Sequence, residues 1–418
     1  MKNIVILGAG FGGLKTAFDL AKGLRRHGLE KEYEISLVDR NSYHTYTPTL
    51  YEIATTSKET ANYVGLKNIV AFDIARLTGG SGINFIKAEI KELDLIGGDV
   101  HFANGTSLRC EYLVLALGSE PNYFGIPGLK ENSLAFRTFI DALKIRDSVL
   151  ELVSANENSK ILIGGGGSSG VELAGEIEEW LGEIKKEPGK HTAEVVIIEG
   201  GPTVLPGFSP KVISLARKRL EKLGVVLKLN EMIEKVIAGK VMLKGGGEET
   251  FDLLIWAGGI KASPIASSLP LKIEQRGRIE VAGAMECLPQ SPDLKLYGKI
   301  YGLGDLICFY DQRTGKPIPG VARAAILQAG IISKNILNEI RGIKNRAEYR
   351  PMTYPYVIPI GGKWAIAQIG PVVLRGLKGW VIKGLIELNY LLSIMPWWQA
   401  VKIWIRGLLI FIKNDRLG

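Results

Sequence analysis

Two glycine-rich turns carry the clearest chemistry in this sequence. Each follows a short apolar run and precedes a helical pattern, with the spacings Gly8-x-Gly10-x-x-Gly13 and Gly165-x-Gly167-x-x-Gly170. The first glycine makes a tight turn, the second lets backbone approach a pyrophosphate, and the third lets the helix pack on the strand. Unpaired N–H groups at the helix start attract the phosphates. The spacing therefore predicts two dinucleotide-binding turns; the alternative is glycine-rich turns that bind nothing.

An acidic residue follows each turn at the end of the next expected strand. These residues are Asp39 and Glu199, and a carboxylate there suits the hydroxyls of an unphosphorylated ribose. Glu199 is followed by Gly200 and Gly201, so no arginine is present for a 2′-phosphate. The second turn therefore favours NADH over NADPH. A solvated carboxylate at a strand end is the alternative for Glu199.

The elements around the turns alternate between strand and helix. Expected strands are Lys2–Leu7, Glu34–Val38, Tyr112–Leu117, Lys160–Ile163, Glu194–Ile198, Leu253–Ala257 and Tyr301–Leu306, with helices to about Gly23 and from about Val171. Such alternation gives parallel sheets through right-handed crossovers. The predicted fold is α/β, with two Rossmann-like domains, the second inserted in the first, and a C-terminal amphipathic helical region. The expected boundaries are 1–145 with 285–345, then 146–284, then 346–418.

Cysteine use and the N-terminus indicate the compartment. Cys110, Cys287 and Cys308 form no CxxC pair, so we expect neither a disulfide framework, nor a zinc site, nor any other metal. The N-terminus runs directly into an apolar segment at Ile4–Leu7, without a secretory signal. The cysteine pattern fits a reducing compartment.

The C-terminal region differs in charge from the rest of the chain. The net charge is +9, and residues 341–418 hold twelve Lys/Arg against three Asp/Glu and five of the seven tryptophans. A basic, tryptophan-rich tail on a neutral body favours contact with an anionic membrane surface and not with nucleic acid.

Spacing within the tail predicts an amphipathic helix. An apolar face is expected from Trp397, Val401, Trp404, Leu408 and Phe411, with Lys402, Arg406 and Lys413 on another face. No run of 18 residues is free of charge, so the segment should lie in the membrane interface and not cross the bilayer. We expect residues 376–418 to make this contact. The alternative is a helix packed on its own core or on a second copy in a homodimer.

Six stretches resemble the type II NADH:quinone oxidoreductases, which belong to the flavoproteins with two dinucleotide-binding domains. They are His44–Ala54, Leu113–Ser119, Asn122–Gly128, Gly170–Glu176, Trp256–Ile260 and Gly302–Asp305. The resemblance implies FAD as cofactor, NADH as substrate and a membrane quinone as acceptor, without proton pumping. It implies a peripheral enzyme on the cytoplasmic side of the cell membrane.

The resemblance also assigns site residues. FAD would be bound by Gly8, Gly10, Phe11, Gly12, Gly13, Asp39, Arg40, His44, Pro48, Gly118, Asp305 and Ala322. NADH would be bound by Gly165, Gly167, Ser168, Ser169, Gly170, Glu199, Gly258 and Gly259.

Two of these assignments have structural alternatives. Glu172, two residues past the last fingerprint glycine, takes the position of the family's active-site glutamate, where it could orient the nicotinamide or carry protons. It could instead only complement the helix dipole. His44 could touch the flavin or be a structural hydrogen-bonding residue.

One segment departs from the family pattern. The family carries Ala-Gln-x-Ala-x-Gln on the quinone side of the flavin, whereas residues 322–327 here place Arg323 and Leu327 at the two glutamine positions. This change leaves the acceptor open. A sulfide:quinone oxidoreductase with reactive cysteines, a protein or oxygen acceptor, and a redox-inactive NADH sensor are the alternatives. Free cysteines are commonly buried small apolar residues, which favours the NADH:quinone interpretation over the one with reactive cysteines.

Overall fold

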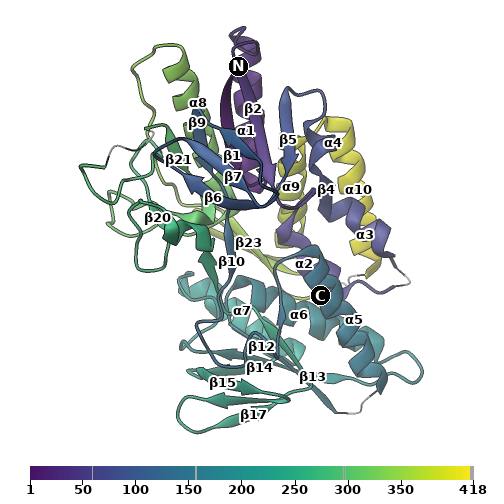
Figure 1. Cartoon of the computed structure of the whole chain (residues 1–418). Coiled ribbons are helices and arrows are strands. Elements are labelled where there is room, and N and C mark those ends of the chain that lie inside the picture. Colours follow the sequence, from purple (N-terminus) through teal and green to yellow (C-terminus); the bar gives the residue numbers. More distant parts are fainter. Residues whose placement is uncertain (59, 156–157, 295, 297, 415–418) are drawn as a thin grey trace. The chain divides into compact units, whose positions relative to one another are not determined.

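The computed structural model describes residues 1–58, 60–155, 158–294, 296 and 298–414 (Figure 1). The chain divides into two compact units. The first unit comprises residues 1–44, 72–120 and 260–354, and the second comprises residues 45–71, 121–259 and 355–418.

A five-stranded parallel sheet forms the centre of the first unit, in the order β21-β9-β1-β2-β5. Its strands are β1 (Lys2–Leu7), β2 (Tyr33–Asp39), β5 (Ile83–Lys87), β9 (Tyr112–Leu115) and β21 (Ile300–Gly302). Ile4 to Leu7 of β1 are fully buried, as expected of a central strand covered on both faces.

Two long helices of the first unit pack against each other, α1 (Phe11–Arg26) and α8 (Ala322–Ile340). Their close approach depends on Gly23, where a Cβ would lie 2.2 Å from the Leu337 side chain. The remaining elements of this unit are α4 (Ile74–Thr78), η2 (Pro264–Ser268), η3 (Gly304–Leu306), β6 (Ile90–Asp94), β7 (Asp99–Phe102), β8 (Ser107–Arg109), β19 (Ile260–Ala262), β20 (Ile279–Glu280) and β22 (Ile307–Cys308). Strands β6, β7 and β8 form a separate antiparallel sheet. Three further short strands, β3 (Tyr43–Thr45), β4 (Ala71–Asp73) and β10 (Ser119–Pro121), lie at the unit boundaries.

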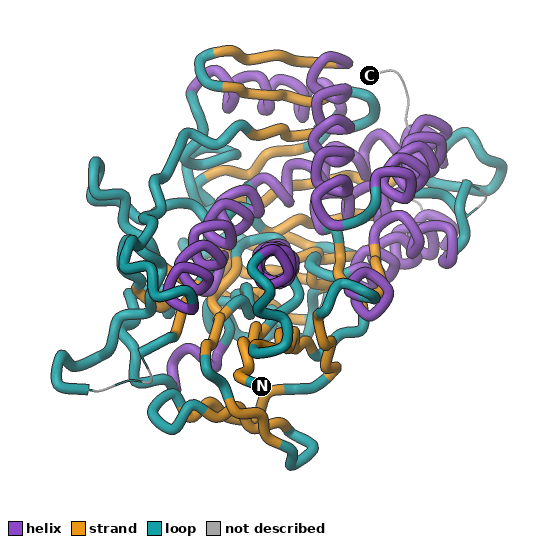
Figure 2. The backbone as a smooth tube through the Cα atoms, turned by 90° about the horizontal axis from the view of Figure 1, so that it is seen from above, coloured by secondary structure: helices purple, strands orange, loops and turns teal. Residues whose placement is uncertain are grey.

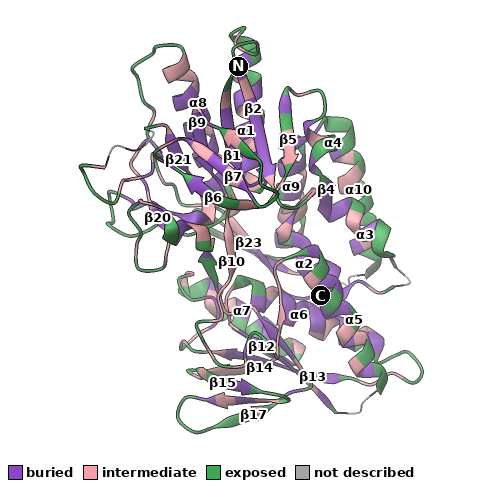
Figure 3. Cartoon of the chain, in the orientation of Figure 1, coloured by how far each residue is buried: buried purple, intermediate pink, exposed green. Residues whose placement is uncertain are grey.

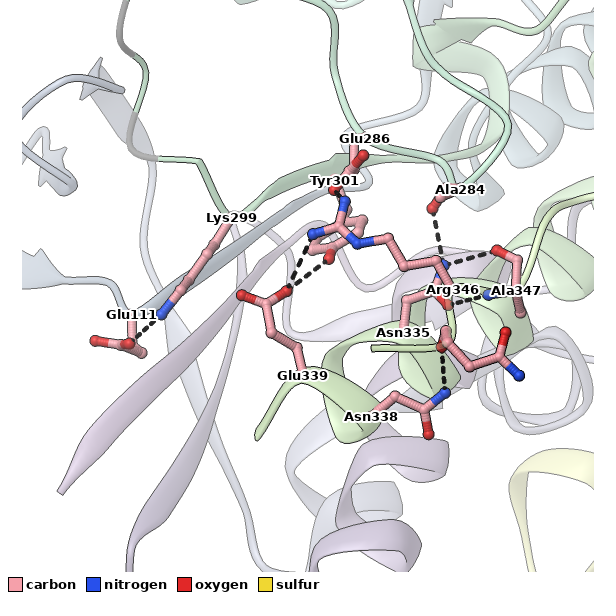
Figure 4. Close-up of polar contacts among 11 residues, drawn as sticks. Glu111, Ala284, Glu286, Lys299, Tyr301, Asn335, Asn338, Glu339, Arg346 and Ala347 are labelled. Atoms are coloured by element: carbon pink, nitrogen blue, oxygen red, sulfur yellow. Dashed lines mark hydrogen bonds and ion pairs between the residues drawn. The ribbon is translucent and has the colours of Figure 1, made fainter. Parts of the chain in front are cut away.

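Polar contacts near the C-terminal end of α8 hold this helix in the first unit (Figure 4). The Asn335 amide donates to the carbonyls of Ala284 and Ala347 at 3.1 and 2.9 Å, and its oxygen accepts from the Ala347 N–H at 2.7 Å. Arg346 pairs with Glu286 and lies 3.7 Å from Glu339. These contacts hold the helix whose first turn carries Ala322.

The second unit repeats the same plan, with a parallel sheet in the order β11-β18-β12-β13-β14. Figure 2 shows the helices and strands along the backbone of the whole chain. Its strands are β11 (Leu134–Ala135), β12 (Ser159–Gly164), β13 (Ala193–Glu199), β14 (Val226–Leu229) and β18 (Leu253–Trp256). As in the first unit, a three-stranded antiparallel sheet comes in the chain just before a strand that flanks the central one, here β18. Its strands are β15 (Ile233–Ile237), β16 (Lys240–Leu243) and β17 (Glu248–Thr250). Both units therefore place one glycine turn after their central strand.

Helices and a C-terminal hairpin (β23 and β24) extended by a third antiparallel strand (β25) complete the second unit. They are η1 (Thr47–Thr49), α2 (Leu50–Thr55), α3 (Tyr63–Val70), α5 (Phe139–Ala155), α6 (Ser168–Ile184), α7 (Pro210–Leu223), β23 (Tyr356–Pro359), β24 (Ala365–Ile369), β25 (Val372–Gly376), α9 (Leu377–Ile394) and α10 (Trp397–Asn414). Arg219 of α7 joins the hairpin segment to this unit, because its guanidinium donates to the carbonyls of Ile360 and Gly361 at 3.0 and 2.8 Å.

The predicted fold class is confirmed, and most expected elements agree within a few residues. The helix expected from about Val171 begins earlier, at Ser168, directly after the glycine turn. The segment expected as a strand at Tyr301–Leu306 is a short strand, Ile300–Gly302, followed by a 3₁₀ turn.

The compact units divide the chain differently from the predicted domain boundaries. Residues 121–145 belong to the second unit, because α5 packs on β11 and β18. Residues 45–71 and 355–414 also belong to it, since α2 packs on α6 and α9 packs on the hairpin. Residues 260–284 belong to the first unit. Residues 355–414 of the tail are thus grouped with the second unit by their contacts, and residues 415–418 lie outside the described part of the chain.

Candidate dinucleotide sites and a buried carboxylate cluster

The first glycine turn, between β1 and α1, is shaped by close backbone contacts. Gly8 has φ +104°, and its N–H donates to the Val38 carbonyl at 2.7 Å. A Cβ on Gly13 would lie 1.8 Å from the Gly8 carbonyl oxygen, and one on Gly12 would collide with Leu303 at 2.2 Å. A side chain at Gly13 would force the turn open, and one at Gly12 would displace the Leu303 side chain.

The second turn, between β12 and α6, has nearly the same geometry. Gly165 has φ +109°, and its N–H donates to the Ile198 carbonyl at 2.8 Å. A Cβ on Gly170 would lie 2.0 Å from the Gly165 oxygen, and one on Gly165 would lie 2.4 Å from Cα of Gly258. Ser168 and Ser169, the first residues of α6, are exposed. The two units therefore hold two copies of one turn.

The middle glycines provide the test of whether the turns fit a ligand. Gly10 and Gly167 have ordinary negative φ angles of −73° and −68°, and a Cβ on either would meet nothing within 4 Å among the described residues. Protein packing and backbone strain therefore do not explain glycine at these positions. Each also begins a helix without a side-chain cap. Open space before unsatisfied helix N–H groups fits a pyrophosphate, so both turns fit a dinucleotide.

A carboxylate is fixed beside each turn by matching hydrogen bonds. Asp39 accepts from the Ala9 N–H at 2.7 Å, and Glu199 accepts from the Gly166 N–H at 2.7 Å. The other oxygen of Glu199 accepts from the Gly201 N–H at 2.7 Å. A carboxylate offers about four lone-pair sites, so each group keeps capacity to accept from ribose hydroxyls.

Asp305 is held near the start of α8 in the first unit. Ser119 donates to its Oδ2 at 2.8 Å, and a Cβ on Gly320 would lie 2.7 Å from its Oδ1. The Gly304 N–H donates to the buried Gln328 side chain at 2.8 Å, which positions this short turn. Gly118, with φ +66°, has open space where a side chain would be.

The two departures from the family pattern lie on the first turns of α8. Ala322 begins the helix without a side-chain cap, and Arg323 beside it is exposed. Leu327 packs against the core of the first unit.

The environment of His44 supports its structural alternative. The ring is buried between Phe11, at 5.1 Å, and Phe72, at 6.5 Å, and its Nδ1 lies 3.0 Å from the Ala9 carbonyl oxygen. Burial lowers its pKa to about 4, against the smaller opposing effect of the Ala9 hydrogen bond, so the ring is neutral at pH 7. His44 thereby stabilises the first glycine turn through its contacts with Ala9 and Phe11.

Two other predicted FAD residues lie on the surface. Arg40 is exposed and lies 3.6 Å from Glu120, and Pro48 is exposed in η1 of the second unit. Their predicted role in binding stays a prediction.

Glu172 lies in a cluster of ionisable groups within the second unit. Lys383 of α9 donates to Oε1 of Glu52, on α2, at 2.5 Å. Glu52 is 1% exposed, and its Oε2 has no hydrogen-bond partner among the described residues. Glu387, one turn beyond Lys383, is also buried. Three carboxylates therefore share one ammonium group.

Burial dominates the protonation of this cluster. It raises the pKa of Glu172 to about 8, with Lys383 acting in the opposite direction and the charge of Glu52 adding to the rise. It raises the pKa of Glu387 to about 7 in the same way. The pKa of Glu52 is also raised by burial, although Lys383 opposes it. At neutral pH the cluster therefore retains protons that exposed carboxyl groups would release.

Sequence reasoning identified only Glu172 of this cluster. Glu52 lay inside a family-like stretch without a role, and Lys383 and Glu387 are among the charges that interrupt the apolar tail. That interruption was the available signal, because charged residues are seldom fully buried unless they are paired.

The three cysteines do not form a reactive site. Cys110, Cys287 and Cys308 are all buried and free of disulfides. Burial raises the pKa of each thiol, that of Cys110 to about 12. Thiolate, the nucleophilic form, is therefore strongly disfavoured, which weighs against the sulfide alternative.

The apolar face predicted for α10 is partly covered by α9. Phe411 is 4% exposed, and the Trp404 indole donates to the Gly384 carbonyl of α9 at 2.8 Å. Val401, Trp404 and Leu408 are half-buried and Trp397 is 67% exposed, so contact of this face with lipid stays a prediction.

A second apolar face of α10 is more exposed. Figure 3 shows the exposed and half-buried residues along the ribbon of the chain. It consists of Trp398, Ile405, Leu409 and Ile412, which are 41–57% exposed. Their spacings place them along one side of the helix, with Lys402, Arg406 and Lys413 beside them. Within the described residues, no helix is both long and apolar enough to cross a bilayer.

Comparisons with known proteins agree with these observations. The model of the family described as pyridine nucleotide-disulphide oxidoreductase matches residues 2–329. A type II NADH:quinone oxidoreductase of Mycobacterium tuberculosis is 28% identical over 418 residues, covering 93% of this chain and 84% of that protein. This relative confirms the resemblance found in the sequence motifs.

Two solved structures share the fold. NDH2 from Plasmodium falciparum in complex with NADH has a TM-score of 0.83 at 17% identity, covering 100% of this chain and 99% of that one. The sulfide:quinone oxidoreductase of Aquifex aeolicus has a TM-score of 0.77 at 19% identity, covering 96% and 92%.

Proposed function

The chain belongs to the pyridine nucleotide-disulphide oxidoreductase family, and from this premise we propose that it is an NADH:quinone oxidoreductase of type II. It takes a hydride from NADH onto FAD and passes two electrons to a membrane quinone, without pumping protons. The name of its Mycobacterium tuberculosis relative supports the substrates.

The observation that carries the proposal is the pair of open glycine turns. Gly10 and Gly167 each leave open space in front of unsatisfied helix N–H groups, which fits a pyrophosphate. In the first unit, Gly8 to Gly13, Asp39, Gly118 and Asp305 would hold FAD, which when bound supplies the hydride acceptor and the two-electron donor. In the second, Gly165 to Gly170 and Glu199 would hold NADH. Gly258, which closes on Gly165, completes that turn.

The carboxylate cluster would hold and release protons during quinone reduction. Reduction of a quinone to a quinol consumes two protons, and Glu172 is protonated at neutral pH because its pKa is about 8. Lys383, bound to Glu52, holds positive charge beside it. We assign Glu172 the holding and release of a proton, and Lys383 the control of when the neighbouring carboxyl groups ionise.

We place the protein on the cytoplasmic face of the cell membrane. The exposed stripe of α10 offers tryptophan and aliphatic side chains for the interface, and its flanking cations suit anionic lipid. A quinone dissolved in lipid is reached only at that surface. Residues 376–414 supply this contact, and pairing of two copies through the same stripe is the competing outcome.

Turnover with different acceptors tests the proposal. Purified holoprotein on liposomes containing a quinone should oxidise NADH, and NADPH should be a poor substitute because Glu199 repels a 2′-phosphate. Oxidation with oxygen as the sole acceptor, unaffected by quinone, would contradict the assignment. Quinone reduction by sulfide in place of NADH would favour the alternative chemistry.

A further inference from the structure

An exposed aromatic residue lies in the second unit in a backbone conformation that aromatic residues avoid. Phe124 has φ +50°, in the left-handed region, and 61% of the residue is exposed. That region favours glycine and is a genuine outlier for a bulky side chain. Burial does not explain the choice of phenylalanine here. Strained residues of this kind gather at ligand-binding sites.

The surrounding loop, residues 122–128, holds Phe124 in place. The Phe124 N–H donates to the Asn122 side chain at 3.0 Å, and the Asn122 N–H donates to the Gly259 carbonyl at 3.0 Å. The Trp256 indole donates to the Asn122 carbonyl at 2.8 Å, and its ring meets Phe124 edge-on at 6.3 Å. The strained backbone is therefore fixed by its neighbours.

A continuous series of close contacts joins Phe124 to the glycine turn. A Cβ on Gly259 would lie 3.0 Å from the Phe124 ring, and one on Gly165 would lie 2.4 Å from Gly258. Trp256 packs against Gly258, since a Cβ on Gly258 would lie 2.4 Å from the Trp256 ring. Phe124 is thus separated from the fingerprint turn by two glycines alone.

The strand order indicates which half of a dinucleotide would reach this position. β13, which ends at Glu199, and β18, which ends before Gly258, lie on opposite sides of β12. A dinucleotide lies across the carboxyl ends of such strands, with its pyrophosphate at the central turn and the adenosine ribose at the acidic residue. The other half therefore extends over β18, toward Gly258, Gly259 and Phe124.

We infer that Phe124 is an NADH-binding residue whose exposed ring packs against the nicotinamide ring of the dinucleotide. This inference rests on the proposed function of the second turn. It predicts that Phe124 distinguishes complete dinucleotides from ADP-ribose, which lacks nicotinamide.

Calorimetry on the oxidised holoprotein tests the inference without turnover, using NAD⁺ and ADP-ribose as probes. Phe124→Ala should raise the Kd for NAD⁺ about fivefold, as expected from loss of an aromatic stacking contact, and leave the Kd for ADP-ribose unchanged. Phe124→Tyr should restore NAD⁺ binding. Glu199→Ala should weaken both probes, and Ile237→Ala, at an exposed apolar position on β15, should weaken neither.

Thermal unfolding separates binding from a structural role. Phe124→Gly relieves the left-handed backbone, so its Tm should equal or exceed that of the wild type while NAD⁺ binding weakens. Unchanged NAD⁺ binding in Phe124→Ala, or equal weakening of both probes, would overturn the inference. If the wild type bound neither probe, the proposed function itself would fail.

Discussion

At the scale of single residues, the main chemical feature is the imbalance of charge around Glu172. Three carboxyl groups lie near one ammonium group, with Glu52 and Glu387 buried and Glu172 half-buried, so full ionisation would leave excess negative charge with little water to solvate it. The cluster avoids this by keeping protons at neutral pH. A site that must supply protons to a product benefits from that property.

Replacing Glu172 by glutamine removes its proton and keeps its shape. We expect turnover to fall about a hundredfold, the lower end for loss of a general acid, with flavin content unchanged. Wild-type turnover should also decline as pH rises through about 8, where Glu172 loses its proton, and the variant should lack that step.

Glu178→Gln is the matched control for that experiment. Glu178 lies on the same helix, and burial raises its pKa to about 7 without the neighbours of Glu172. Its turnover should match that of the wild type. Unaltered kinetics in Glu172→Gln would remove the proposed role.

Removing the cation beside Glu52 should destabilise the fold in a pH-dependent way. The pKa of Glu52 is raised in the folded state, so its neutral form is favoured there and stability is lost as pH rises. In Lys383→Met this loss should grow between pH 5 and pH 9, approaching about 3 kcal/mol in free energy of unfolding. Denaturant unfolding at both pH values measures it.

The double variant Glu52→Gln/Lys383→Met provides the control. Its amide carries no charge, so most of the stability at pH 9 should return. If Lys383→Met lowered the free energy of unfolding equally at both pH values, packing and not charge would decide the effect.

At the scale of elements, the glycine turns show which sequence signals are ligand signals. Gly13 and Gly170 are required by close backbone contact, whereas Gly10 and Gly167 are not. The motif predicted all four glycines. Only the structure distinguishes the glycines required by packing from those that leave space for a ligand.

Gly10→Ala and Gly167→Ala exploit that difference. Neither Cβ meets protein atoms among the described residues, so Tm should stay close to that of the wild type, apart from loss of bound nucleotide. Gly10→Ala should lose FAD, and Gly167→Ala should keep FAD and bind NADH weakly. Flavin absorbance after gel filtration and NADH titration measure the two effects, and full nucleotide binding in both variants would contradict the assignment.

The tail shows where periodicity alone misleads. Helical spacing correctly predicted an amphipathic helix, α10, but two apolar faces exist and the sequence does not show which one α9 covers. The inward face contains Phe411 and Trp404, whereas the outward face contains Trp398 and Leu409.

The exposed face of α10 can be tested by placing charge on it. Trp398→Glu/Leu409→Glu should abolish sedimentation with anionic liposomes, because a buried carboxylate in the interface is costly and repels anionic lipid. Ile96→Glu, at an exposed apolar position of the first unit, should bind as the wild type does. Liposome binding that persists, with a halved molecular mass in solution, would instead identify the stripe as a dimer contact.

At the scale of the whole molecule, one plan appears twice in a single chain. Both units have a five-stranded parallel sheet, an antiparallel three-stranded sheet and a glycine turn after the central strand. Strand and turn patterns predicted this duplication, because they are local signals.

The unit boundaries were not predictable in the same way. Residues 45–71 and 121–145 join the second unit through helix packing far along the chain, at α6 and β18. Such long-range pairings leave no periodicity in the sequence. The grouping of Glu52, Lys383 and Glu387 with Glu172 was missed for the same reason.

Anaerobic titration with NADH is the most direct test of the central claim, that two turns of one chain bind two nucleotides which exchange a hydride. The wild-type holoprotein should lose its yellow colour with about one NADH per flavin, as a single hydride transfer requires, and should regain it on addition of a short-chain quinone. Gly167→Ala should hold the same flavin and need far more NADH. A wild-type flavin that stays oxidised in excess NADH would contradict the account.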